Sequence, residues 1–212
     1  MKNNEPLSSL SHFIMFLLSI AGLVLLIIRS LELGTIWHVV SFSIFGSSLI
    51  LLYLTSALYH FFPVGSKSKR IFKKMDHSFI YLLIAGTYTP ICLTVLRGGL
   101  GWSIFGIVWG FALLGVIIKS TNLKINGWIS TLTYILMGWT ILIALSPLID
   151  SVDKQGIILL FAGGIFYTTG TIFFGLGKMA SKKRLFGMHE IFHFFVAAGS
   201  FSHFWFMLKY LI

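Results

Sequence analysis

The stretch HFIMFLLSIAGLVLLII, residues 12–28, decides the fold because it contains no Asp, Glu, Lys or Arg. A helix needs about 17–25 mostly apolar residues to cross the hydrocarbon core of a bilayer, and six similar runs follow. The seven predicted helices cover residues 12–28, 36–62, 78–96, 101–118, 127–148, 156–176 and 185–212. These runs are too long for strands and lack period-two alternation. The sequence therefore predicts an all-α, polytopic membrane protein, with a single seven-helix bundle over residues 1–212.

The composition supports this fold class. Hydrophobic residues make up 57% of the chain and charged residues only 10%, whereas a soluble domain carries about 25% charged residues. The net charge is +10, but the basic residues lie between apolar runs, which favours a topology signal over nucleic-acid binding. The single cysteine, Cys92, lies inside an apolar run and excludes an intramolecular disulfide.

The Lys and Arg residues are distributed unequally between the two ends of the predicted bundle. Twelve of them lie on the side of the N-terminus: Lys2, Lys67, Lys69, Arg70, Lys73, Lys74, Lys119, Lys124, Lys178, Lys182, Lys183 and Arg184. The other four are Arg29, Arg97, Lys154 and Lys209. The positive-inside rule therefore predicts a cytoplasmic N-terminus, and an odd number of crossings then places the C-terminus outside.

Ionisable residues from distant segments fall near the predicted cytoplasmic ends of the helices. His189 and His193 are four residues apart, so both imidazoles share one helix face, about 5–6 Å apart at Cβ. Two such imidazoles can bind one metal ion, and His60 is the best candidate for a third ligand. A catalytic zinc ion uses three protein ligands and leaves one position for water.

Asp76 and Ser56 are the candidate catalytic residues. Zinc lowers the pKa of a bound water towards about 7, and Asp76 is placed to accept its proton and pass it to a leaving group. Ser56 precedes His60 by one helical turn and shares its face. An amide or ester of a membrane lipid, entering from the inner leaflet, is the expected substrate.

The other polar residues receive structural interpretations. Histidines on one helix face are often hydrogen-bonded interior residues rather than ligands. His38 and His203 are expected to be packing or interfacial residues in the outer half of the bundle. His77 points about 100° away from Asp76 and is expected to support the site or lie at the surface. Glu190 is expected to pair with a loop lysine.

At these residues the sequence resembles the hemolysin III family of bacterial membrane proteins. That family belongs with the progestin and adiponectin Q receptors, in a wider group that includes alkaline ceramidases. Three motifs carry the resemblance, in the same order along the chain: Ser56-Ala-Leu-Tyr-His60; Asp76-His77-Ser78 with Ala85-Gly86-Thr87-Tyr88-Thr89-Pro90; and His189-Glu190-Ile191-Phe192-His193. The family's N-terminal pattern of Glu, Asn and His is matched by Glu5 and His12, but Ser8 stands in the place of Asn.

The resemblance implies a seven-helix fold with the N-terminus inside. It also implies zinc bound by His60, His189 and His193, with Asp76 and Ser56 close by. For the receptor and ceramidase relatives it implies hydrolysis of lipid amides. For the bacterial branch it implies only a name, which comes from pore-forming haemolytic activity, and a link to membrane lipid balance.

Three functions follow as hypotheses. The leading one is a zinc-dependent hydrolase of a lipid amide or ester, in the plasma membrane of a bacterial cell. The first alternative is a non-enzymatic sensor or receptor-like protein in which zinc is structural. The second alternative is a cytolytic protein, which ranks lower because a secreted toxin is expected to have a soluble form or an export signal.

Overall fold

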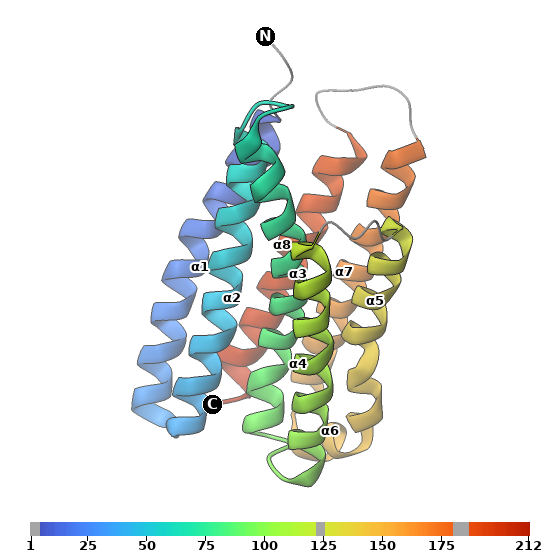
Figure 1. Ribbon diagram of the computed structural model, residues 1–212. Helices are drawn as coiled ribbons and strands as arrows, with labels where there is room; N and C mark the ends of the chain where they lie inside the picture. The colour runs from blue at the N-terminus through green and yellow to red at the C-terminus, as the bar shows by residue number, and fades with distance from the viewer. Residues whose placement is uncertain (1–4, 122–125, 180–186) are drawn as a thin grey trace.

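The computed structural model of the chain describes residues 5–121, 126–179 and 187–212, and within these ranges it contains helices and no strand. The helices lie side by side in an elongated bundle (Figure 1). Their bounds are α1 Pro6–Leu33, α2 Ile36–Phe61, α3 Lys67–Leu93, α4 Gly99–Ser120, α5 Gly127–Trp139, the 3-10 helix η1 Thr140–Ala144, α6 Leu145–Ser151, α7 Lys154–Met179 and α8 Met188–Tyr210. Helices α5, η1 and α6 follow one another as a single crossing. The described residues confirm the predicted all-α membrane bundle.

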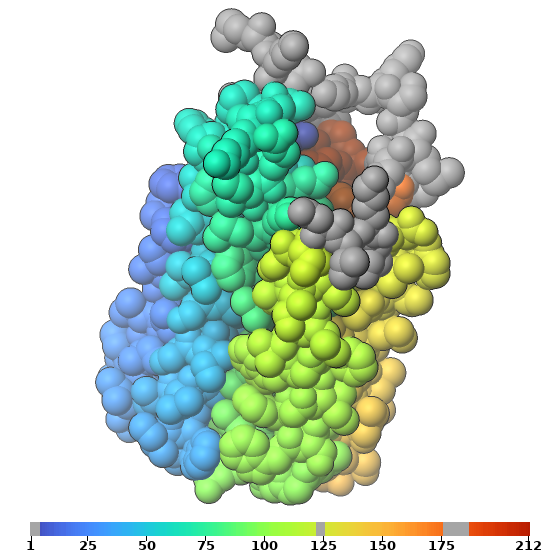
Figure 2. All heavy atoms as spheres, viewed as in Figure 1, coloured from blue at the N-terminus to red at the C-terminus, as the bar shows by residue number. Residues whose placement is uncertain are grey.

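Six of the crossings are long and apolar enough to span a membrane: α1, α2, α4, the segment Gly127–Ser151, α7 and α8. The remaining crossing, α3, has 27 residues but is more polar. It packs against α2, α4 and α5, and its second half is almost entirely buried. A helix that its neighbours shield from lipid can carry polar side chains that a lipid-facing helix cannot. Large apolar side chains are exposed on the outer surface instead. With all atoms drawn, neighbouring helices pack against one another in one elongated body (Figure 2).

The basic stretch 67–74 is helical, although the sequence predicted a loop there and a helix only from Ser78. These residues form the first two turns of α3. The Ser66 hydroxyl caps this helix by accepting a hydrogen bond from the Lys69 backbone N–H at 3.1 Å. Lys and Arg are good helix formers, so the helix extends beyond its apolar part. Hydropathy marks the hydrocarbon crossing, whereas capping marks the start of the helix.

The helix predicted over 127–148 is interrupted. Its backbone changes to a 3-10 helix at Thr140 and continues as α6 to Ser151. The Tyr88 hydroxyl accepts a hydrogen bond from the Ile141 N–H and donates one to the Gly138 carbonyl, both at 2.8 Å. Irregular backbone at membrane depth needs such partners within the protein. The interruption therefore depends on a side chain of α3.

The other predicted helices are present with shifted ends. Helix α1 begins at Pro6 rather than His12, with proline in the first turn, where its missing N–H is harmless. The predicted start of the last helix at Leu185 lies outside the described residues.

The start of α1 and the end of α8 lie at opposite ends of the bundle, as an odd number of crossings requires (Figure 1). The end of α8 reaches the start of α2, where His38 Nε2 lies 2.7 Å from the Leu211 carbonyl oxygen. His203 Nε2 lies 3.1 Å from the Leu160 carbonyl oxygen. Both histidines are hydrogen-bonded packing residues, as predicted.

Candidate metal centre

Three histidines from two helices meet near the end of the bundle where α1 begins. His60 lies in the last turn of α2, and His189 and His193 lie in the first two turns of α8. Each residue offers one ring nitrogen such that all three nitrogens lie within 4.8 Å of one another. The structure thus brings together three side chains that lie as far as 133 residues apart in the sequence.

The spacing of one pair of these nitrogens equals that expected on a tetrahedral metal ion. Zinc binds imidazole nitrogens at about 2.0–2.1 Å, so two nitrogens on one tetrahedral ion lie about 3.3–3.4 Å apart. His60 Nε2 and His189 Nε2 are separated by 3.4 Å. The His193 ring lies close to both, with centroid distances of 4.8 Å to His60 and 4.5 Å to His189. A three-imidazole set suits zinc and several other transition metals.

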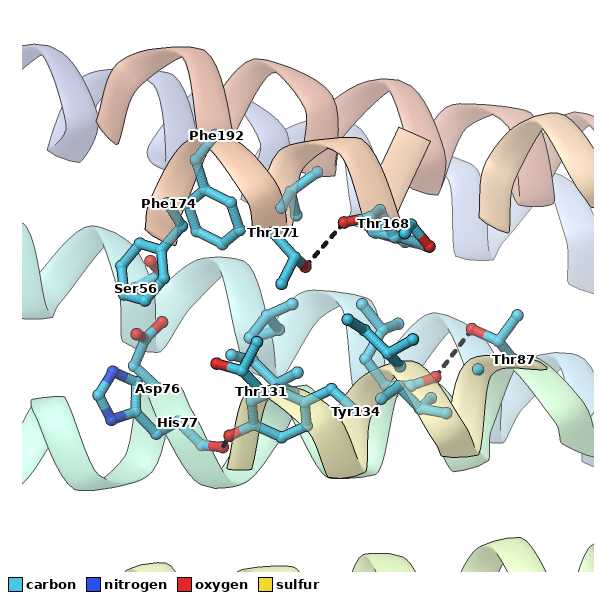
Figure 3. A pocket seen from close by; sticks show the side chains of 18 of the residues that line it. Ser56, Asp76, His77, Thr87, Thr131, Tyr134, Thr168, Thr171, Phe174 and Phe192 are labelled. Carbon is cyan, nitrogen blue, oxygen red and sulfur yellow. Dashed lines mark hydrogen bonds between the residues drawn. The ribbon is translucent and has the colours of Figure 1, made fainter. Parts of the chain in front are cut away.

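Asp76 and Ser56 lie beside this group. Ser56 is one turn before His60 on α2, and Asp76 lies on α3. The Ser56 hydroxyl and the Asp76 carboxyl face each other at one end of a cavity (Figure 3). The same cavity is lined by all three histidines. The predicted catalytic pair and the predicted ligands therefore open onto one space.

The cavity has a volume of about 510 Å³ and lies between α2, α3, α5, α7 and α8. Away from Asp76 its lining is mainly apolar. The hydroxyls of Thr87, Thr168 and Thr171 donate to carbonyl oxygens one turn earlier in their own helices, each at 2.8 Å. Because these hydroxyls are already bonded, the threonines add little polarity to the cavity. One end is therefore polar, and the remainder suits a hydrocarbon chain.

Comparison with known proteins identifies the family of the chain. The sequence model of the family described as "Haemolysin-III related" matches residues 1–204. The chain belongs to the haemolysin-III related family. It is 44% identical over 208 residues to the "Hemolysin-3 homolog" of Bacillus subtilis (strain 168), covering 98% of this chain and 94% of that protein. It is 42% identical over 208 residues to "Hemolysin-3" of Bacillus cereus, covering 98% and 92%.

A more distant likeness extends beyond bacteria. The chain is 24% identical over 182 residues to the human "Monocyte to macrophage differentiation factor", covering 82% of this chain and 72% of that protein. The haemolysin-III resemblance predicted from the three motifs is therefore confirmed over nearly the whole chain.

Glu5 is a residue of the haemolysin-III site that spacing did not identify. Its Oε2 lies 2.7 Å from His60 Nδ1 and 3.5 Å from Lys69 Nζ. The hydrogen bond from His60 is the main reason that the pKa of the Glu5 carboxyl is lowered to about 2. Only the family pattern pointed to Glu5, because no periodicity relates a residue before α1 to the last turn of α2.

His12 also lies in this group. Its ring stacks on His193 with centroids 3.8 Å apart and planes inclined by 24°. Among the described residues, neither of its buried ring nitrogens has a hydrogen-bond partner. The start of α1 therefore contacts histidines of the group on both α2 and α8: Glu5 contacts His60, and His12 contacts His193.

Glu190 and His77 lie close to the histidine group. The Glu190 carboxylate accepts hydrogen bonds from the Ser8 hydroxyl at 3.2 Å and the Gly187 N–H at 2.9 Å. Its predicted pairing with a loop lysine stays a prediction, because the neighbouring loop lysines lie outside the described residues. The Gly187 N–H lies at the start of α8, where backbone donors lack partners within the helix. Ser8, where the family has Asn, therefore links α1 to α8. His77 is partly buried and lines the cavity beside Asp76.

Proposed function

We propose that this haemolysin-III related protein is a zinc-dependent hydrolase of a lipid amide or ester, acting at the inner leaflet of a bacterial plasma membrane. The observation that carries the proposal is a three-histidine group opening onto a cavity with a carboxylate and a hydroxyl at one end and an apolar lining beyond. This combination matches a substrate with one polar reacting group and a long hydrocarbon chain.

His60, His189 and His193 would hold the metal. When bound, zinc supplies Lewis-acid chemistry and lowers the pKa of water towards about 7. Hydrolysis adds the elements of water across the scissile bond, with hydroxyl on the carbonyl carbon and hydrogen on the leaving amine or alcohol. Asp76 would accept the proton from the attacking water and deliver it to that leaving group. Ser56, which faces Asp76, would hold its carboxyl in place by donating a hydrogen bond to it.

The cavity lining supports a lipid as the substrate. Isoleucine, leucine and phenylalanine side chains line it beyond the histidines, and they come from α3, α7 and α8. Its volume of about 510 Å³ lies within the range of about 300–1,000 Å³ that small-molecule sites occupy. A carbonyl group placed between Asp76 and the three histidines would leave its acyl chain among these apolar side chains.

The metal assignment is tested by elemental analysis of purified protein. We expect about one zinc per chain in the wild type, and loss of zinc in His60→Ala and His193→Ala, since each removes one of three ligands. His38→Ala is a matched control, because His38 bonds to the Leu211 carbonyl and lies away from the site. Full zinc occupancy in both site variants would contradict the assignment.

Hydrolysis is tested on the wild-type protein with a panel of ceramides and other acyl lipids in mixed micelles. We expect release of a fatty acid from at least one lipid class, loss of that activity with a zinc chelator, and recovery when zinc is added back. Zinc-loaded protein that hydrolyses no lipid in the panel would contradict the hydrolase and favour the sensor with a structural zinc.

A further inference from the structure

The second ring nitrogen of His60 meets a carboxylate. Glu5 Oε2 lies 2.7 Å from His60 Nδ1, and the His60 side chain is 2% exposed. An ionised carboxylate only accepts hydrogen bonds, so Nδ1 must carry the hydrogen. In the neutral imidazole the lone pair of His60 is therefore on Nε2, the atom that lies 3.4 Å from His189 Nε2.

Two further contacts hold Glu5 against the end of α2. The Glu5 backbone N–H donates to the His60 carbonyl oxygen at 3.4 Å. Lys69 Nζ lies 3.5 Å from the same Glu5 oxygen that faces His60, and 4.8 Å from the centre of the Tyr59 ring. Lys69 is therefore held between a carboxylate and an aromatic face. The carboxylate lies between a fixed cation and the imidazole.

The other buried ligand lacks such support. Among the residues that the structure describes, His193 Nδ1 has no hydrogen-bond partner. His60 is thus the member of the group whose tautomer a carboxylate determines.

We propose that Glu5 is a positioning residue for metal binding, which holds His60 with its hydrogen on Nδ1 and its Nε2 lone pair directed at the ion. This rests on the three-histidine metal site of the proposed function. A carboxylate on the far nitrogen of a ligand histidine fixes the ring and raises its basicity, and its loss typically weakens metal binding about 10–100-fold. Because Glu5 precedes α1, the site is complete only when this segment is docked on α2.

The test is a competition titration of purified full-length protein with a chromophoric zinc chelator. We expect Glu5→Ala to weaken zinc binding about 10–100-fold. Glu5→Gln should weaken it less, because the amide oxygen still accepts the Nδ1 hydrogen but carries no charge. Ser9→Ala is the matched control: the Ser9 hydroxyl bonds to the Ala57 carbonyl at 3.0 Å and joins the same segment to α2 without touching a histidine.

A second readout separates orientation of His60 from general stability. In metal-free protein labelled with 15N-histidine, the His60 ring signals are identified by their loss in His60→Ala. We expect the hydrogen on Nδ1 in the wild type and a mixture of tautomers in Glu5→Ala. If Glu5→Ala fails to fold by circular dichroism, the isosteric Glu5→Gln variant decides the result.

Two results would overturn the proposal: zinc affinities of the Glu5 variants equal to that of Ser9→Ala, or a wild-type His60 with its hydrogen on Nε2. Wild-type protein that binds no zinc would overturn the metal site as well. Neither readout uses hydrolysis, so failure to find a lipid substrate would leave the role of Glu5 standing.

Discussion

Asp76 and Ser56 face each other at the polar end of the cavity. If Asp76 moves the proton during hydrolysis, Asp76→Asn should lower kcat by about 10²–10⁴-fold while zinc remains bound, because proton transfer by a positioned side chain contributes that much. Ser56→Ala should have a smaller effect, since it removes only the group that orients Asp76. Steady-state kinetics and zinc content on the same samples check this. Loss of zinc in Asp76→Asn would instead make Asp76 a ligand.

The sequence predicted single residues well where a helical repeat relates them. The spacing of His189 and His193 alone places both on one face of α8, and Ser56 and His60 are related in the same way on α2. Glu5 could not be found from spacing, because it contacts His60 across 55 residues and from outside any helix. The bonding of Glu190 to Gly187 and Ser8 depends on how α1 docks on α8, which no local pattern encodes.

At the level of helices, α3 and α4 approach closely at Gly115. A Cβ on Gly115 would lie 2.6 Å from ring atoms of Tyr81, whereas a Cβ on Gly110 of the same helix would meet nothing within 4 Å. Gly115→Ala should therefore destabilise the bundle by about 1–3 kcal/mol, the usual effect of overpacking. Gly110→Ala, the control, should be neutral or slightly stabilising, because alanine is the better helix former. Thermal unfolding in detergent compares them, and equal melting temperatures would contradict the close approach.

The helices themselves were predicted from apolar runs, and their departures have identifiable causes. Capping by Ser66 begins α3 well before its apolar part, and the Tyr88 hydroxyl satisfies the backbone where α5 gives way to η1. The first cause is local and is visible in the sequence as a serine before a run of helix formers. The second is a contact between residues 53 apart, so hydropathy alone predicts one continuous helix there.

For the whole molecule, the packing of the helices explains how a polar site can lie within a membrane protein whose outer surface is apolar. Helix α3 brings Asp76 into the interior because its neighbours shield it from lipid, and α1, α2 and α8 surround the three histidines. The basic first turns of α3 lie at the same end of the bundle as this site (Figure 1). The three histidines and the basic residues of the predicted topology signal therefore lie at one end of the molecule. The side of the membrane that this end faces determines which leaflet the site can use.

The positive-inside rule predicts the orientation in the membrane, and an impermeant maleimide can measure it. The native Cys92 is fully buried and should stay unlabelled, which leaves a silent background. Lys67→Cys lies at the basic end and Asp153→Cys at the opposite end, and both positions are exposed. We expect Asp153→Cys to be labelled in intact cells and Lys67→Cys only after permeabilisation, since basic residues remain in the cytoplasm. The reverse pattern would place the histidine site at the outer leaflet and rule out substrates confined to the inner one.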